Sequence, residues 1–168
     1  MTEPQTIHLA DYQPFSHRLL SVDLTFRLHP TATRVLARLQ LAPNPDRPGP
    51  HDLFLHGENL RLIAARIDGT LVAPLVDDLG LTIPADILPQ HPFVLETEVE
   101  IAPEGNTALE GLYMSNGMYC TQCEAEGFRK ITFYPDRPDV MARFRVRIES
   151  DLPVLLSNGN PTDRKSVV

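Results

Sequence analysis

The sequence of 168 residues has no tryptophan, two cysteines and only 7% aromatic residues. With so few flat side chains, it has little material for a surface on which sugars or nucleic-acid bases could stack. Its formal charge is −7, and its lysines and arginines are scattered, so it lacks the basic patch that nucleic acids and anionic membranes require. We therefore expect no nucleic-acid partner and no membrane partner.

Long apolar runs are also missing. No stretch approaches the roughly 20 apolar residues of a membrane span. The first residues, Met-Thr-Glu-Pro-Gln-Thr, have neither the basic nor the apolar region of a secretory signal. Two cysteines without such a signal indicate a reducing compartment. We expect a soluble, cytoplasmic protein.

Patterns for metal binding and catalysis are absent as well. Cys120 and Cys123 have the C-x-x-C spacing, but no second pair accompanies them, and on an extended strand they would face opposite sides. The βαβ setting of a redox C-x-x-C motif is not there either. The six histidines form no His-x-His or His-x-x-x-His pair, and no glycine-rich phosphate loop occurs. We interpret the cysteines as structural and expect neither a metal site nor a catalytic residue.

Short segments of alternating apolar and polar residues make up most of the chain, and sixteen prolines lie mainly between them. Such alternation indicates half-buried β-strands. We expect about ten short strands and no helix longer than two turns. The strands are expected at 17–28, 35–41, 52–55, 60–67, 70–74, 80–83, 93–101, 112–115, 118–124, 131–134, 143–149 and 154–157, with a hairpin turn at Asp68-Gly69. The fold class is therefore all-β, with an antiparallel, strongly curved sheet or a distorted β-sandwich.

The stretch 111–129 holds the residues of greatest chemical interest. Asn116-Gly117 predicts a tight type I′ turn between two strands. On the second strand, Cys120, Gln122 and Glu124 would share one face. A solvated strand face is one interpretation of Gln122 and Glu124. Recognition of a positively charged amine is the other, because a carboxylate pairs with an ammonium group through charge-assisted hydrogen bonds.

Two runs carry a family resemblance: Thr-Gln-Cys-Glu-Ala-Glu-Gly-Phe-Arg at 121–129 and Phe-Tyr-Pro-Asp-Arg-Pro-Asp-Val at 133–140. Together with 106–113 and 155–160, in the same order, they resemble the N-terminal domain of the bacterial aminopeptidase N family, of the gluzincin class of zinc aminopeptidases. The similarity runs from about residue 12 to 160. It implies a saddle-like β-domain in which Glu124 holds the α-ammonium group of the substrate and Gln122 lines the pocket for the first side chain. We treat Glu126 as structural.

The catalytic half of that family is not in this sequence. The family binds zinc through His-Glu-x-x-His and a third glutamate, and it completes amine recognition with a Gly-x-Met-Glu-Asn loop; neither motif occurs here. The resemblance thus implies zinc in the full-length enzyme and none in this chain, which alone is expected to be inactive. We divide the sequence into a lead-in at 1–16, a β-sandwich domain at 17–160 and an atypical tail at 161–168, with the catalytic domain absent.

We therefore predict the substrate-anchoring N-terminal domain of a zinc metallo-aminopeptidase, which would bind peptide N-termini together with a catalytic domain. The alternative is a stand-alone, non-catalytic β-sandwich module for binding or interaction, derived from the same family. An unrelated immunoglobulin-like sandwich would need the Cys…Trp…Cys spacing, which is missing.

Two local predictions concern the C-terminal third. The strand 154–157 would lack a return strand, and we expect its exposed edge to pair two copies as a homodimer. Asp136, Arg137 and Asp139 are expected to form an ion-pair and cap cluster, with Asp136 capping one helical turn.

Overall fold

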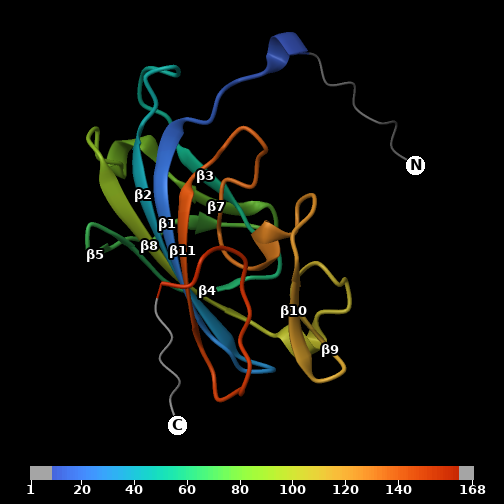
Figure 1. Cartoon of the computed structure of the whole chain (residues 1–168). Coiled ribbons are helices and arrows are strands. Elements are labelled where there is room, and N and C mark those ends of the chain that lie inside the picture. Colours follow the sequence, from blue (N-terminus) through green and yellow to red (C-terminus); the bar gives the residue numbers. More distant parts are fainter. Residues whose placement is uncertain (1–8, 163–168) are drawn as a thin grey trace.

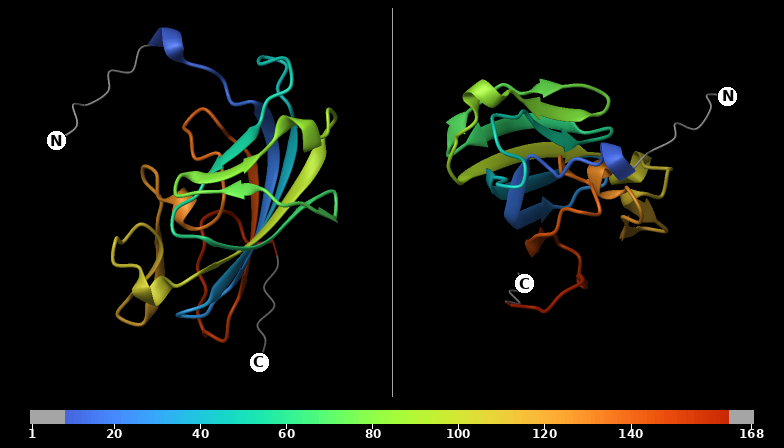
Figure 2. Two further views of the ribbon diagram at one scale, coloured as in Figure 1. Left: turned by 180° about the vertical axis from the view of Figure 1, so that it is seen from behind. Right: turned by 90° about the horizontal axis from the view of Figure 1, so that it is seen from above.

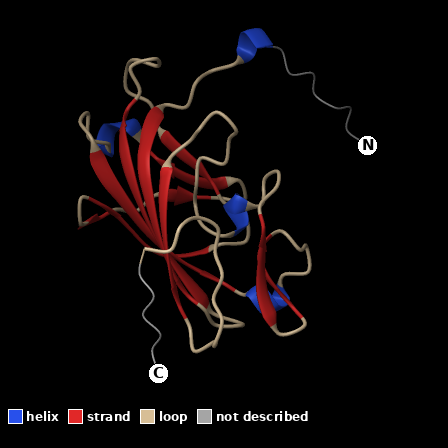
Figure 3. Ribbon diagram, viewed as in Figure 1, coloured by secondary structure: helices blue, strands red, loops and turns tan. Residues whose placement is uncertain are grey.

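The computed structural model describes residues 9–162, which form eleven strands and four single-turn 3-10 helices. Figure 3 shows how strands dominate the fold, with one short helix before the first strand and the others in the connections between strands. None of the helices in residues 9–162 has the length and apolar character that crossing a membrane requires. The strands are β1 (His17–Arg27), β2 (Thr33–Pro43), β3 (Leu53–His56), β4 (Arg61–Ile67), β5 (Thr70–Leu71), β6 (Leu75–Val76), β7 (Gly80–Ile83), β8 (Phe93–Ile101), β9 (Gly111–Ser115), β10 (Met118–Gln122) and β11 (Arg143–Glu149). The 3-10 helices are η1 (Leu9–Asp11), η2 (Ala85–Ile87), η3 (Pro103–Gly105) and η4 (Phe128–Lys130).

Three sheets make up the fold. The largest has six strands in the order β11-β1-β2-β8-β4-β5, the second has the order β3-β7-β6, and the third is the β9–β10 hairpin. Figures 1 and 2 show the second sheet lying over one face of the large, twisted first sheet. The all-β, curved-sandwich prediction is confirmed. The prediction that the strands are antiparallel fails for β11, which pairs with β1 in parallel. The pairs β1–β2, β2–β8 and β8–β4 are antiparallel.

Alternation along the long strands separates a buried face from a charged one. In β8, every second residue from Phe93 to Ile101 is buried, as the period of two requires. On the opposite face, Arg34 of β2 binds Glu98 at 2.7 Å and Glu100 at 2.9 Å. Partly exposed pairs of this kind contribute about 0.2–1 kcal/mol each. The apolar face is therefore the main source of stability.

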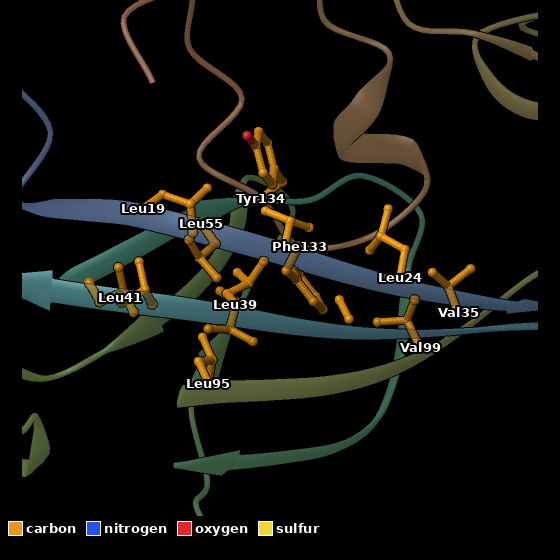
Figure 4. Close-up of a cluster of buried hydrophobic side chains, with 14 of the residues drawn as sticks. Leu19, Leu24, Val35, Leu39, Leu41, Leu55, Leu95, Val99, Phe133 and Tyr134 are labelled. Atoms are coloured by element: carbon orange, nitrogen blue, oxygen red, sulfur yellow. The ribbon is translucent and has the colours of Figure 1, made fainter. Parts of the chain in front are cut away.

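The core fills the space between the two larger sheets. Its fully buried side chains include Leu39 and Val99 from the large sheet and Leu55 from β3. Phe133 enters this space from a loop: Figure 4 shows its ring pointing toward Leu39 and Val99, while the neighbouring Tyr134 points away. Phe133 is only 1% exposed. This aromatic anchor ties the segment after η4 to the sandwich.

Two expected strands are wrong. Residues 128–132 form a tight turn, in which the N–H groups of Ile131 and Thr132 donate to the carbonyl of Phe128, and within 131–134 only Tyr134 makes a β-bridge, with His56. Residues 131–135 are all buried, so this apolar run is a core insertion rather than an alternating strand. Residues 154–157 are exposed and have no strand partner among the described residues. The edge from which the homodimer was predicted is therefore not formed.

Candidate functional site

The β9–β10 hairpin lies beside the large sheet in the views of Figures 1 and 2. Asn116 and Gly117 have φ angles of 52° and 81°, which confirms the type I′ turn predicted from this dipeptide. The ladder runs from Ser115 paired with Met118 to Gly111 paired with Gln122. The hairpin thus delivers Gln122 to its open end, next to the rest of the domain.

Strand β10 ends at Gln122, so the prediction that it continues to Glu124 is wrong. Its partner β9 begins at Gly111, whose φ of +71° takes the backbone out of the extended region, and no ladder can continue past it. The carbonyl of Cys123 instead accepts the N–H of Gly127 at 3.1 Å and closes a turn. Glu124 therefore lies in the Cys123–Gly127 turn, hereafter the anchor loop, and not on a strand face with Gln122. The Glu124–Ala125 peptide bond in this loop is cis.

Gly127 allows the anchor loop to fold tightly against the hairpin. A Cβ atom at this position would clash with the carbonyl oxygen of Gln122 and would approach the nitrogen of Gly111 to 3.0 Å. Backbone atoms cannot move aside as the end of a side chain can. The glycine in the Glu-Ala-Glu-Gly run is thus required by close backbone packing.

The structure distinguishes the two glutamates of the anchor loop. Glu126 lies 3.4 Å from Arg129 Nη1, and the pair is separated by three residues. Glu124 is exposed and makes no hydrogen bond or ion pair with any residue in 9–162. Gln122 is exposed too, and its side chain has no partner within the same range. The anchor loop therefore presents a carboxylate and the hairpin end an amide, neither of which has a side-chain partner within residues 9–162.

Arg129 fixes the base of the anchor loop through Asp136. The carboxylate oxygen Oδ2 of Asp136 accepts the main-chain N–H of Arg129 at 3.2 Å and its Nε–H at 3.0 Å, and Nη2 donates to the Asp136 carbonyl at 3.2 Å. The side chains of the pair are only 13% and 12% exposed. The expected cap role of Asp136 is wrong in detail, because no helical turn follows it and the N–H it accepts belongs to Arg129.

A second set of contacts joins this region to the end of β3. The N–H of Glu58 donates to the carbonyl of Arg129 at 2.9 Å, and Lys130 pairs with Glu110 and, at 3.6 Å, with Glu58. His56 and Tyr134 exchange two main-chain hydrogen bonds of 2.9 and 3.1 Å. The anchor loop is therefore attached to the sandwich at its base, while its tip is open.

Aromatic packing supports the same attachment. Phe128, Tyr134 and Phe144 form a triangle with ring centroids 4.6 to 5.9 Å apart. Burial raises the pKa of Tyr134 to about 12, so the residue acts here as a neutral packing group. The sequence indicated Tyr134 and Phe144 only as strand residues and Phe128 only as part of the 121–129 run, because their contacts join segments that are distant along the chain.

The two cysteines are free. Burial, with a smaller contribution from Asp136, raises the pKa of Cys123. Within residues 9–162, no three His, Cys, Asp or Glu side chains gather in a way that could hold a metal ion. The described residues therefore do not fit a zinc site, and we assign no step of chemistry to a metal held by them.

The expected ion pair of Arg137 and Asp139 is present at 2.8 Å. It binds the segment before β1: Tyr12 donates its hydroxyl hydrogen to Asp139 at 2.8 Å, and Arg137 Nη2 donates to the carbonyl of Gln13 at 2.8 Å. Within the lead-in, Phe15 and Ser16 are buried. This cluster is a clamp on the N-terminal segment and, among the described residues, makes no hydrogen bond or ion pair with the anchor loop.

A hollow of about 530 Å³ was not expected from the sequence. It lies between the residues after β3 and those after β6, and Glu58, Asp77 and Asp78 give it an acidic lining beside Phe133. Asp77 Oδ1 accepts the N–H groups of Leu79 and Gly80. The residues that line it are far apart in the sequence, so no local motif could have indicated it.

The chain is similar to known proteins in both sequence and fold. The Peptidase M1 N-terminal domain family matches residues 58–167. The chain is 51% identical over 162 residues to Aminopeptidase N of Caulobacter vibrioides and 42% identical over 161 residues to Aminopeptidase N of Escherichia coli. Each alignment covers 94% of this chain and 18% of the relative, so the chain spans about a fifth of the length of these enzymes.

The solved structures agree. The crystal structure of Legionella pneumophila aminopeptidase A in complex with aspartic acid matches with a TM-score of 0.81 and 33% identity, over 90% of this chain and 18% of that one. Native yeast LTA4 hydrolase, at 21% identity, shares the fold with a TM-score of 0.68 over 83% of this chain and 24% of that one. The family match, the identity to the aminopeptidases and the matching β fold lead to one conclusion: the chain belongs to the Peptidase M1 N-terminal domain family.

Proposed function

We propose that this domain anchors the N-terminus of a peptide substrate for a zinc metallo-aminopeptidase, with the zinc and the catalytic residues supplied by a catalytic domain. Glu124 would bind the α-ammonium group, and Gln122 would line the pocket for the first side chain. The single observation that carries the proposal is the free carboxylate of Glu124 on a loop whose base is fixed. A preformed acceptor of this kind binds an ammonium group without first breaking an internal ion pair.

The contrast with Glu126 supports this assignment. Both glutamates are exposed and lie in the same loop, but Arg129 is close enough to neutralise Glu126. A ligand ammonium group at Glu126 would compete with that arginine, whereas at Glu124 it meets no cation among the described residues. The proposal therefore selects one carboxylate of the pair.

The test uses a hybrid enzyme in which this chain replaces the aligned segment of Aminopeptidase N from Caulobacter vibrioides, to which it is 51% identical. We expect Glu124→Gln to lower kcat/KM for an amino-acid anilide by about 30- to 1,000-fold, since loss of one partner of a desolvated charge pair costs roughly 2–4 kcal/mol. Glu104→Gln is the matched control, because Glu104 is also exposed and lies in η3, which contacts β9. It should change kcat/KM by less than about 3-fold, as a surface substitution does.

Equal kinetics for wild type and Glu124→Gln would reject the anchoring role. A hybrid that folds and carries zinc but has no activity with wild-type Glu124 would favour the alternative, a stand-alone binding module of the same family. The cytoplasmic location and the homodimer also remain predictions, although the 154–157 edge strand on which the homodimer was based is not formed. Fractionation of cells that express the chain decides the first, and light scattering over a concentration series decides the second.

A further inference from the structure

The contacts of Arg129 link the anchor loop to the rest of the domain. Three of its nitrogen atoms, the main-chain N, Nε and Nη2, donate to Asp136, while Nη1 lies 3.4 Å from Glu126 in the anchor loop. Its carbonyl accepts the N–H of Glu58, two residues beyond the end of β3. The one residue therefore contacts the anchor loop, the segment after Tyr134 and the end of β3.

We propose that Arg129 is a positioning residue for Glu124: together with Asp136 it holds the anchor loop so that the free carboxylate keeps a set place relative to the sandwich. The inference rests on the proposed function of Glu124. It adds a residue that would not touch substrate and would act only through the loop.

The geometry requires an arginine in particular. The guanidinium group is planar and has five donors in a fixed fork, so it can bind Asp136 with Nε and Nη2 while Nη1 faces Glu126. A lysine would carry the same charge on one nitrogen and could not reach the three acceptors with this geometry. The pair with Asp136 is largely shielded from water, whereas Glu126 is 71% exposed. Asp136 therefore fixes the arginine, and the arginine in turn restrains the loop.

Arg137 provides a matched control. It is also an arginine in a short pair with an aspartate, Asp139, at 2.8 Å. Its other hydrogen bond goes to the carbonyl of Gln13, on the side of the N-terminal segment. Arg137→Lys thus makes the same chemical change eight positions away without touching the anchor loop.

The first experiment uses the chain as it is and measures amide hydrogen exchange. The probe is the N–H of Gly127, which donates to the carbonyl of Cys123 and closes the anchor loop. We expect Arg129→Lys to speed exchange of this amide by about 10-fold or more through local opening, with amides in the centre of β8 unchanged. In Arg137→Lys, the exchange rate of the Gly127 amide should equal that of the wild type. Unchanged exchange in Arg129→Lys, or equal acceleration by both variants, overturns the inference.

The second experiment is a double-mutant cycle in the hybrid enzyme. We expect Arg129→Lys to lower kcat/KM about 10-fold when Glu124 is present, since a small misplacement of a binding group can cost up to about 100-fold. In the Glu124→Gln background the same change should cost less than about 2-fold, because there is no longer a carboxylate to position. A purely structural role would give the same loss in both backgrounds, and that result overturns the inference.

The two proposals fail in different ways. If Glu124→Gln alone leaves kcat/KM unchanged, the proposed function fails, while the exchange experiment still decides whether Arg129 holds the loop. If Glu124→Gln is damaging and Arg129→Lys is not, only the positioning role fails.

Discussion

The ring of Phe133 occupies the space in which a Cβ atom at position 57 would have to lie. Gly57 directly follows β3, whereas Phe133 lies in the segment that returns from η4. The glycine therefore allows this segment to pack into the core. The same segment carries Tyr134 to its bridge with His56 and Asp136 to its pair with Arg129. The contact between Gly57 and Phe133 thus supports the base of the anchor loop.

We expect Gly57→Ala to lower the free energy of unfolding by about 1–3 kcal/mol, because an added methyl group overpacks the core against the ring. Urea unfolding of the chain measures this cost. In a Phe133→Leu background, where the ring is gone, the same substitution should cost clearly less. Equal costs in the two backgrounds would show that the contact does not govern this part of the core.

The buried His17 predicts a dependence of stability on pH. Burial, and to a lesser extent the charge of His51, lowers the pKa of His17 to about 4. The unfolded chain takes up this proton near pH 6.5, so the folded state loses stability as the pH falls from about 6.5 to about 4 and keeps it above that range.

The matched variant is His17→Asn, whose amide group can still form a hydrogen bond with Ser16 Oγ, which lies 2.9 Å from Nδ1 in the wild type. As the pH falls from about 6.5 to about 4, the free energy of unfolding of the wild type should decrease by up to about 3 kcal/mol more than that of the variant. Unfolding curves at closely spaced pH values test this. Parallel profiles for the two proteins would rule out His17 as the cause.

Cys123 should behave as a structural thiol. Its raised pKa means fewer thiolates at neutral pH, and only the thiolate reacts. In a Cys120→Ser variant, we expect labelling of Cys123 at pH 8 to be several-fold slower than labelling of a free thiol. The rate should continue to rise above the pH at which an ordinary cysteine is ionised. Rapid labelling at pH 7 would contradict the structural interpretation.

Much of the fold could be predicted from alternation and turn chemistry. β7 and β8 lie exactly at the expected residues, and the turn at Asn116-Gly117 has the expected positive φ angles. These features depend on neighbours along the chain. By contrast, 131–134 reads as a strand from its apolar residues, but its place between the sheets depends on Gly57, which is distant in sequence. The parallel pairing of β11 with β1 likewise has no local signal.

In the candidate site, too, the features that depend on neighbours along the chain could be predicted, and those that depend on distant residues could not. The run 121–129 indicated both the family and the residues of interest, Gln122 and Glu124. The end of β10 could not be foreseen, because it depends on where the partner strand begins, at Gly111. The different surroundings of Glu124 and Glu126 could not be foreseen either, because they follow from the orientation of Arg129 toward Asp136.

The measurement that tests the central claim most directly compares two inhibitors of the hybrid enzyme, an amino-acid hydroxamate and the same compound without its amino group. If Glu124 binds the ammonium group, the wild type should prefer the first by about 30- to 1,000-fold, the equivalent of roughly 2–4 kcal/mol for one desolvated charge pair. Glu124→Gln should reduce this preference to less than about 3-fold through loss of the first compound's affinity, with the affinity for the second unchanged. The same preference in wild type and variant would contradict the account.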